Sequence, residues 1–364
     1  MSDIPPVSEL RHSVIHPLYL RKGCCSNGNP QDTMSRFCWK PPGFACATLL
    51  WCVMFAAPVY AETSNTYPDK PITFVVPYPA GGVADQFARS MATELGNRLG
   101  QAVVVNNRAG ANGNIGSAYA AKQPADGYTL LLGSTSTLAV NPHLYKDMGY
   151  DPIKDLQPVT LTHQMPNVLI VGKNTPYKTV ADVVEAARRE PGKIAFGSAG
   201  NGNSMHLAGE LFQKQSRTKL MHVPYKGAPP ALTDVMGGAL PTMFINLPAV
   251  VGYAGSDKIR ILAVAAPERS KSLPNVPTFK EAGVPGVESS VWNGILVRRG
   301  TPGAIVERLN KDIVAILQSA SFREPLERQG YEVLSSTPDE FSALLQKDTR
   351  VMGEQVRNAG IHID

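Results

Sequence analysis

The chain has no cysteine beyond residue 52, because all five of its cysteines lie at positions 24, 25, 38, 46 and 52. The remaining residues therefore offer no thiol for nucleophilic catalysis, for a disulfide or for a metal site. A clustered basic surface is also missing, since the net charge is only +5 over 364 residues and the Lys and Arg residues are scattered. This distribution excludes nucleic acid as the expected partner.

Catalytic and metal-binding motifs are equally scarce. The HExxH zinc pattern is absent, and Gly197-Ser198-Ala199-Gly200 differs from the Gly-x-Ser-x-Gly nucleophile motif. We expect His206 to cap a helix or to lie in a core. The sequence therefore predicts no catalytic residue, no metal and no cofactor. The alternative is an exported hydrolase that acts on a small carboxylate or ester and uses Ser198 or Ser204 with His206.

The N-terminal region has the pattern of a secretory signal. Arg36 and Lys40 precede an apolar run over residues 44–57, and Val59 and Ala61 occupy the two positions before the cleavage point that require small residues. The apolar run is short for a membrane span. We therefore predict a signal peptide over residues 34–61 that is cleaved after about Ala61, with an uncleaved anchor as the alternative. Residues 1–33 are expected to be an upstream extension, or the result of a start assigned too early.

Strand-like and helix-like patterns alternate through the rest of the chain, which is typical of a parallel α/β sheet. Apolar residues at 87, 91, 95 and 99, for example, recur at helical spacing after a strand-like stretch. The expected strands are residues 72–77, 102–106, 128–134, 167–173, 193–198, 220–225, 241–246, 259–266 and 291–297. The expected helices lie near residues 87–99, 115–122, 180–189, 205–215 and 230–238, with two more beginning at Pro302 and Pro338.

This order of elements predicts two domains. Residues 62–164 and 286–364 are expected to form domain 1, and residues 165–285 to form domain 2, so that the chain leaves the first domain, builds the second and returns. Each domain contains one glycine-rich turn between a strand and a helix. Turns at the carboxyl ends of strands line the ligand crevice of open α/β sheets.

The first of these turns suits the capture of an anion. Gly81 and Gly82 let the backbone approach a ligand closely, and the amides at the start of the next helix attract negative charge. Phosphate is disfavoured, because Asp85 follows the glycines and no phosphate-loop lysine is present. We expect a carboxylate instead. Asp85 would accept a hydrogen bond from a group beside that carboxylate, or would simply cap the helix, and the two roles can coexist.

A second polar turn follows the expected strand at residues 193–198. It supplies hydroxyls, amides and bare backbone, which suit a small carboxylate that must later be released. The residues concerned are Ser198, Gly200, Asn201, Gly202, Asn203 and Ser204. The alternative is an ordinary loop with Asn203 or Ser204 as the helix cap. A third polar strand end, at Ser134, Thr135 and Ser136, would complete a polar ring.

Six segments of the chain, in their order, resemble the solute-binding receptors of tripartite tricarboxylate transporters, the Bug-type receptors. They are PYPAGGVAD, GANGNIGSAYAAKQPADGYTLLLGS, GSAGNGNSMHLAGELF, VPYKGAPPALTDVMGG, LPNVPTFKEAG and the GTP at residues 300–302. The resemblance extends from Tyr67 to Asp364. It implies an α/β fold of the periplasmic-binding-protein type II kind, with two α/β domains around a ligand cleft. It also implies a non-enzymatic, periplasmic receptor that closes on a small organic acid.

The resemblance further implies which residues hold the ligand. In that family, two glycine-rich loops hold a carboxylate largely through backbone groups and bridging waters. The matching residues and further candidates are Tyr78, Ala80, Gly81, Gly82, Asp85, Ser134, Thr135, Ser198, Gly200, Asn201, Gly202, Tyr225 and Asn246. The implied partners are the membrane permease subunits of a tripartite tricarboxylate transporter, or a signalling protein. The receptor is expected to be a monomer.

The chain also departs from the pattern of the family. Asn106 stands where Glu is frequent, and Ala109 and Asn112 stand where Pro and Gly are common. The segment at Asn246 lacks an acidic residue, and Arg298–Arg299 replaces a Pro-containing segment. We expect the first group to adjust a loop and the second to alter contacts with the distal end of the ligand.

Overall fold

The computed structural model describes residues 67–359, so the predicted signal peptide and upstream extension lie outside the described residues. The strands are β1 (Ile72–Val76), β2 (Val103–Asn107), β3 (Thr129–Ser134), β4 (Leu156–Gly172), β5 (Ala195–Ser198), β6 (Met221–Pro224), β7 (Thr242–Asn246), β8 (Ile259–Val264), β9 (Ser290–Arg298) and β10 (Glu332–Val333). The α-helices are α1 (Val83–Leu99), α2 (Asn114–Ala121), α3 (Val180–Arg189), α4 (Ser204–Ser216), α5 (Ala228–Gly237), α6 (Gly303–Gln318), α7 (Ala320–Arg328) and α8 (Pro338–Ala359).

Helix α1 forms because its apolar residues recur at helical spacing and can be buried together. Phe87, Met91 and Leu95 are fully or almost fully buried on one face of the helix. The helix ends at Gly100, which adopts the left-handed conformation with φ 69° and donates its N–H to Gly96 O. Because this face is buried, Gly81 and Gly82 of the preceding turn are attached to a helix that is anchored in the core.

The described strands form one ten-stranded mixed sheet. β1 pairs in parallel with β2 and β3, and β5 pairs in parallel with β6 and β7. β9 runs antiparallel to β3 and β4, and β4 runs antiparallel to β7 and β8. The prediction of a parallel sheet is therefore wrong for the connecting strands. β9 thus runs opposite to β1, β2 and β3, and β4 runs opposite to β5, β6 and β7.

Strand β4 passes from one half of the sheet to the other. Its first part pairs with β9 and β10, and its second part, from Asn167 onward, pairs with β7. The sequence predicts a strand only over residues 167–173, because Pro158 and Pro166 interrupt the strand pattern. The register shifts between Pro158 and Thr160, so the irregularity is absorbed and the strand continues.

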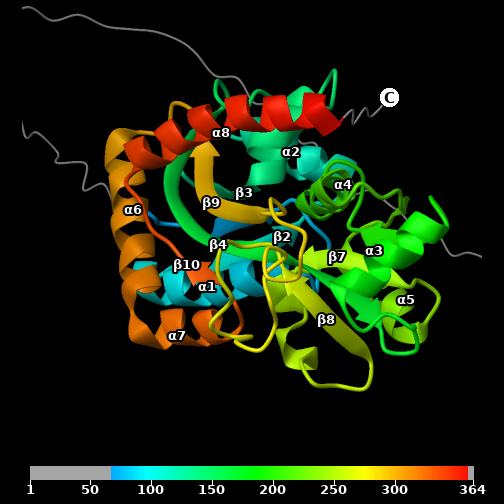
Figure 1. Cartoon of the computed structure of the whole chain (residues 1–364). Coiled ribbons are helices and arrows are strands. Elements are labelled where there is room, and N and C mark those ends of the chain that lie inside the picture. Colours follow the sequence, from blue (N-terminus) through cyan, green and yellow to red (C-terminus); the bar gives the residue numbers. More distant parts are fainter. Residues whose placement is uncertain (1–66, 360–364) are drawn as a thin grey trace, which may run out of the picture. The chain divides into compact units, whose positions relative to one another are not determined.

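Two sets of buried side chains lie on either side of this crossing. Residues 168–287 supply one core, in which Phe196, Phe212, Phe244 and Phe279 pack against one another. Residues 72–165 and 291–345 supply two further clusters, which together are called the first core below, whereas the core of residues 168–287 is called the second core. Figure 1 shows α6, α7 and α8 around one half of the sheet and α3, α4 and α5 around the other. The architecture is therefore α/β with two separate cores joined by long strands.

The C-terminal segment contains one helix and one strand more than the sequence predicts. Helix α7 contains Pro325, which predicts a break and not a helix. The helix forms nevertheless, because Phe322 and Leu326, four residues apart, are both buried in the core that contains β1. Strand β10 follows and pairs with β4.

Candidate ligand-binding site

The turn between β1 and α1 is braced by its own carboxylate. Asp85 is 3% exposed, and its Oδ2 accepts hydrogen bonds from Gly81 N at 2.9 Å and from Arg89 Nε at 3.0 Å. Arg89 Nη2 lies 3.0 Å from the other carboxylate oxygen. Burial raises the pKa of Asp85, but the hydrogen bonds from Arg89 and Gly81 outweigh it and lower that pKa. Asp85 thus braces the turn at Gly81 and makes no cap hydrogen bond to α1, and a direct contact with a ligand stays a prediction.

The turn lies against a polar wall formed by the end of β3. The hydroxyl of Tyr78 and Ser134 Oγ are 2.6 Å apart, and burial raises the pKa of Tyr78 to about 12. Thr135 Oγ1 accepts a hydrogen bond from Trp292 N at 3.0 Å. Tyr78 and Ser134 are therefore hydrogen-bonded to each other, whereas Thr135 is held separately by the backbone of Trp292.

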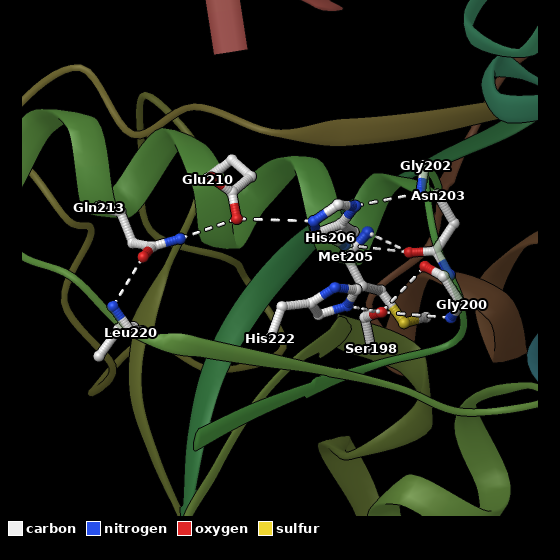
Figure 2. Close-up of polar contacts among 10 residues, drawn as sticks. All are labelled: Ser198, Gly200, Gly202, Asn203, Met205, His206, Glu210, Gln213, Leu220 and His222. Carbon is white, nitrogen blue, oxygen red and sulfur yellow. Dashed lines mark hydrogen bonds and ion pairs between the residues drawn. The ribbon is translucent and has the colours of Figure 1, made fainter. Parts of the chain in front are cut away.

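The loop between β5 and α4 is the second predicted turn (Figure 2). Gly200 and Gly202 have backbone φ values of +133° and +74°, which residues other than glycine rarely adopt. Asn203 caps α4, because its Oδ1 accepts hydrogen bonds from Met205 N and His206 N. Its Nδ2 is buried without a hydrogen-bond partner. The predicted cap at Asn203 is confirmed, and the side chain keeps one donor available.

The serine of this loop is paired with a histidine that the sequence did not single out. Ser198 Oγ lies 2.7 Å from Nε2 of His222 on β6. His206, the partner required by the hydrolase alternative, instead accepts a hydrogen bond from Gly202 N through Nδ1. Ser198 is fully buried, and its hydroxyl also bonds to both backbone groups of Gly200. The hydrolase pairing of Ser198 with His206 is therefore wrong, and His206 has the capping and core role that was expected.

The two turns meet through a third segment, the one that follows β6. Gly227 N donates to Ala199 O at 3.2 Å, which ties this segment to the loop between β5 and α4. A Cβ added to Gly227 would lie 2.9 Å from Cγ of Pro79 in the turn between β1 and α1. The backbone at Gly227, which belongs to the half of the sheet around the core of residues 168–287, thus touches Pro79 in the glycine turn of the other half.

The remaining predicted residues differ in their accessibility. Ala80, Gly81 and Asn201 are exposed at the surface of these turns. Tyr225 donates its hydroxyl to Asp234 at 2.6 Å, and this hydrogen bond, with burial, raises the pKa of Tyr225 to about 12. Asn246 is 5% exposed and donates to Asn167 Oδ1 at 3.0 Å. Tyr225 and Asn246 therefore both have structural hydrogen bonds.

A large groove opens beside the turns. Its volume is about 1330 Å³, and residues from both cores line it. They include Thr135, Gln164, Ser204, Glu210, Trp292 and Asp348. Among the thirteen predicted ligand-binding residues, all of which are described, Thr135 alone lines this groove. The groove reaches the first turn of α4 at Ser204, next to the buried amide of Asn203.

The comparison with known proteins decides the family. The model of the tripartite tricarboxylate transporter family receptor matches residues 87–361. The chain belongs to the tripartite tricarboxylate transporter receptor family. Protein BugT of Bordetella pertussis is 38% identical to this receptor over 306 residues, which cover 84% of the chain and 93% of BugT.

Solved structures agree with this assignment. The structure of R. palustris Rpa4515 with adipate is 37% identical, has a TM-score of 0.79, and is matched over 82% of this receptor and 100% of that chain. The structure of the periplasmic binding protein BugD is 32% identical, with a TM-score of 0.77 and the same two coverages. The receptor therefore has the fold of periplasmic solute-binding proteins, as predicted.

Family membership also decides the class of activity. Receptors of this family are periplasmic binding proteins that serve tripartite tricarboxylate transporters, so the chain is a receptor and not an enzyme. Within residues 67–359, no helix is both long and apolar enough to cross a membrane. In the same range, no group of three His, Cys, Asp or Glu side chains is arranged to hold a metal ion.

Proposed function

We propose that the receptor captures a small carboxylate between the turn that precedes α1 and the loop that precedes α4. The observation that carries this proposal is that Gly227 links the two turns: Pro79 of the first turn lies against it, and Ala199 of the second accepts its N–H. A ligand at this junction would touch both cores at once. Such a ligand favours the closed state, because only that state offers both sets of contacts.

The helix starts supply the positive potential for the carboxylate. Helices α1 and α4 begin at these turns, and the first amides of a helix have no intrahelical acceptor. In α4, Asn203 already accepts the N–H groups of Met205 and His206, so the free amides are those of α1. Gly82, the N-cap of α1, has no side chain that could occupy those amides. Asp85 does not oppose the ligand as an isolated charge would, since Arg89 is paired with it. The proposed ligand-binding residues are Tyr78, Ala80, Gly81, Gly82, Ser134, Thr135, Ser198, Gly200, Asn201, Gly202, Tyr225 and Asn246, together with Asp85, which acts by holding the turn in place.

Adipate is the first candidate ligand, because the similar protein Rpa4515 was solved with it. A few charge-assisted hydrogen bonds, less the cost of ordering, give a complex in the micromolar range, or about −8 kcal/mol. A thermal-shift screen of adipate, succinate, malate, citrate, aspartate and benzoate, followed by calorimetry of the best acid, tests this function. We expect one acid to bind with a stoichiometry of one and to be recovered unchanged. Binding of none of these acids, or consumption of the acid, would contradict the proposal.

The location and the domain limits are part of the same proposal. The mature receptor begins after about Ala61, acts in the periplasm as a monomer, and delivers its ligand to permease subunits or to a signalling partner. Domain 1 consists of residues 62–164 and 286–364, and domain 2 of residues 165–285. The cores agree with these limits to within two residues, since Met165 packs in the core of domain 1 and Val287 in that of domain 2. Mass spectrometry of the N-terminus of the periplasmic protein tests the cleavage site.

A further inference from the structure

Two histidines stack on each other directly behind the loop that precedes α4. The rings of His206 on α4 and His222 on β6 are 3.8 Å apart between centroids, and their planes differ by only 9° (Figure 2). Phe196 on β5 stacks against His222 at 4.9 Å. These two histidines, called the histidine pair below, lie 16 residues apart in the sequence and come from different elements. Their stacking therefore depends on the tertiary fold.

Each ring of the histidine pair holds a different end of the loop. Nε2 of His222 contacts Ser198 Oγ at 2.7 Å, and the same oxygen lies 3.2 Å from Gly200 N and 3.0 Å from Gly200 O. Nδ1 of His206 accepts the N–H of Gly202 at 3.1 Å. The loop from Ser198 to Gly202 is thus attached at its start and at its end, and its two glycines have the positive φ values that need such support.

The hydrogen bonds define the protonation of the pair. Because Gly202 N–H donates to Nδ1 of His206, the neutral ring carries its proton on Nε2, which faces Glu210 Oε1 at 3.5 Å. Glu210 in turn accepts a hydrogen bond from Gln213 at 2.8 Å. Burial and the neighbouring His206 lower the pKa of His222 to about 3, so this ring stays neutral. His222 therefore acts as a neutral ring, through its hydrogen bond and its stacking, and His206 acts through the hydrogen bond that its Nδ1 accepts.

We infer that the histidine pair consists of positioning residues, which hold the Ser198–Gly202 loop in the conformation that binds the ligand. This inference rests on the proposed function, since that loop is one of the two that hold the carboxylate. The imidazole nitrogens do not face the ligand. They fix the directions of the Ser198 hydroxyl and of the Gly202 amide, so their loss would lower affinity by loosening the loop.

Substitutions that retain or remove one nitrogen separate this role from simple packing. His222→Phe keeps a stacking ring but removes the partner of Ser198, whereas His222→Gln places an amide where Nε2 lies. Likewise His206→Phe removes the acceptor for Gly202 N–H, and His206→Asn places an oxygen where Nδ1 lies. His143→Phe is the control, because it also removes a contact between a histidine nitrogen and the chain, that of His143 with Thr349 O.

Calorimetry with the acid from the panel above that binds the wild type most tightly gives the first readout. We expect His222→Phe and His206→Phe to raise Kd about tenfold or more, the change expected from losing one well-made hydrogen bond in the loop. His222→Gln and His206→Asn are expected to restore Kd to within about threefold of the wild type, and His143→Phe to leave it unchanged. An unchanged Kd in both Phe variants overturns the inference and leaves the proposed function intact.

Hydrogen exchange of the ligand-free protein gives a second readout that does not depend on any acid. We expect peptides that contain Gly200 and Gly202 to exchange at least about tenfold faster in the two Phe variants than in the wild type or in His143→Phe. If the wild type binds no acid of the panel, the proposed function fails, and exchange alone decides whether the pair holds the loop. Unchanged exchange in these peptides overturns the inference in either case.

Discussion

Pro79 and Gly227 lie against each other although 147 positions separate them in the chain, and the first belongs to the turn before α1 while the second is the N-cap of α5. No side chain fits at position 227, because a Cβ there would lie 2.9 Å from Pro79 Cγ. Contact between the two halves of the receptor therefore requires a residue without a side chain at position 227. The following predictions test this contact and the elements around it.

Gly227→Ala is expected to weaken ligand binding as well as stability. The residue has φ 111° and ψ 167°, a conformation that is open almost only to glycine, so strain of about 1–3 kcal/mol is expected from the backbone alone. The methyl group would also push Pro79 away. Gly238→Ala is the control, because Gly238 has φ 81° but no atom within 4 Å of an added Cβ. Calorimetry should show a higher Kd for Gly227→Ala only; equal Kd values for the two variants would refute the proposed contact.

Asp85→Ala is expected to lower the free energy of unfolding by about 1 kcal/mol, because Gly81 and Arg89 lose their common acceptor. Asp85→Asn keeps an oxygen for the Gly81 amide and should retain Kd within about threefold of the wild type. Urea denaturation and calorimetry of the two variants provide the measurements. A loss of binding beyond tenfold in Asp85→Asn, with stability unchanged, would instead show that the carboxylate touches the ligand.

Gly209→Ala is expected to destabilise the receptor by about 1–3 kcal/mol through overpacking. A Cβ at position 209 of α4 would lie 2.2 Å from Cε2 of Phe196, the ring that stacks against His222. Gly237→Ala in α5 is the matched control, since nothing lies within 4 Å of a Cβ there and the substitution should stabilise the helix slightly. Thermal denaturation should move the two Tm values in opposite directions. A rise in Tm for Gly209→Ala would contradict the packing described.

Stability is expected to fall in acid because of buried His163, which packs 4.2 Å from Phe87 and 5.0 Å from Tyr331. Burial lowers the pKa of His163 from 6.5 to about 3. The unfolded chain then binds more protons between these values, so stability is complete above pH 6.5 and decreases as the pH falls toward 3. His163 alone contributes a slope of up to about 1.4 kcal/mol per pH unit.

Urea denaturation at pH 7, 6, 5 and 4 measures this slope. His163→Leu should flatten it, whereas a substitution at the exposed His143 should leave it as it is in the wild type. His222 contributes in the same direction, because its pKa is also lowered to about 3. An identical slope in the wild type and in His163→Leu would rule out His163 as the source.

Local patterns predict most elements of this fold, since the periodicity of buried residues is visible in the sequence. Helix α3, for example, covers the predicted residues 180–189, and its buried Val180, Val183 and Ala187 lie on one face. The length of β4 and the existence of α7 were missed because Pro158, Pro166 and Pro325 argue locally for breaks. In each case tertiary contacts outweigh the local preference.

In the candidate site, too, local features could be predicted from the sequence and tertiary contacts could not. The cap at Asn203 follows from residue type and position, which are local. The contact of Ser198 with His222 does not, because it depends on the parallel pairing of β5 with β6, in which Phe196 is opposite His222. Nothing in the spacing of Ser198 and His222 indicates that register. The contact of Pro79 with Gly227 also joins distant parts of the chain, and no local pattern in the sequence predicts it.

A crystal structure of the receptor with the most tightly bound acid of the panel tests the central claim most directly. We predict a carboxylate group between the turn at Gly81–Gly82 and the loop at Ser198–Gly202, within hydrogen-bonding distance of backbone amides from both sides. An acid that is seated only in the 1330 Å³ groove, away from both glycine turns, would contradict this account.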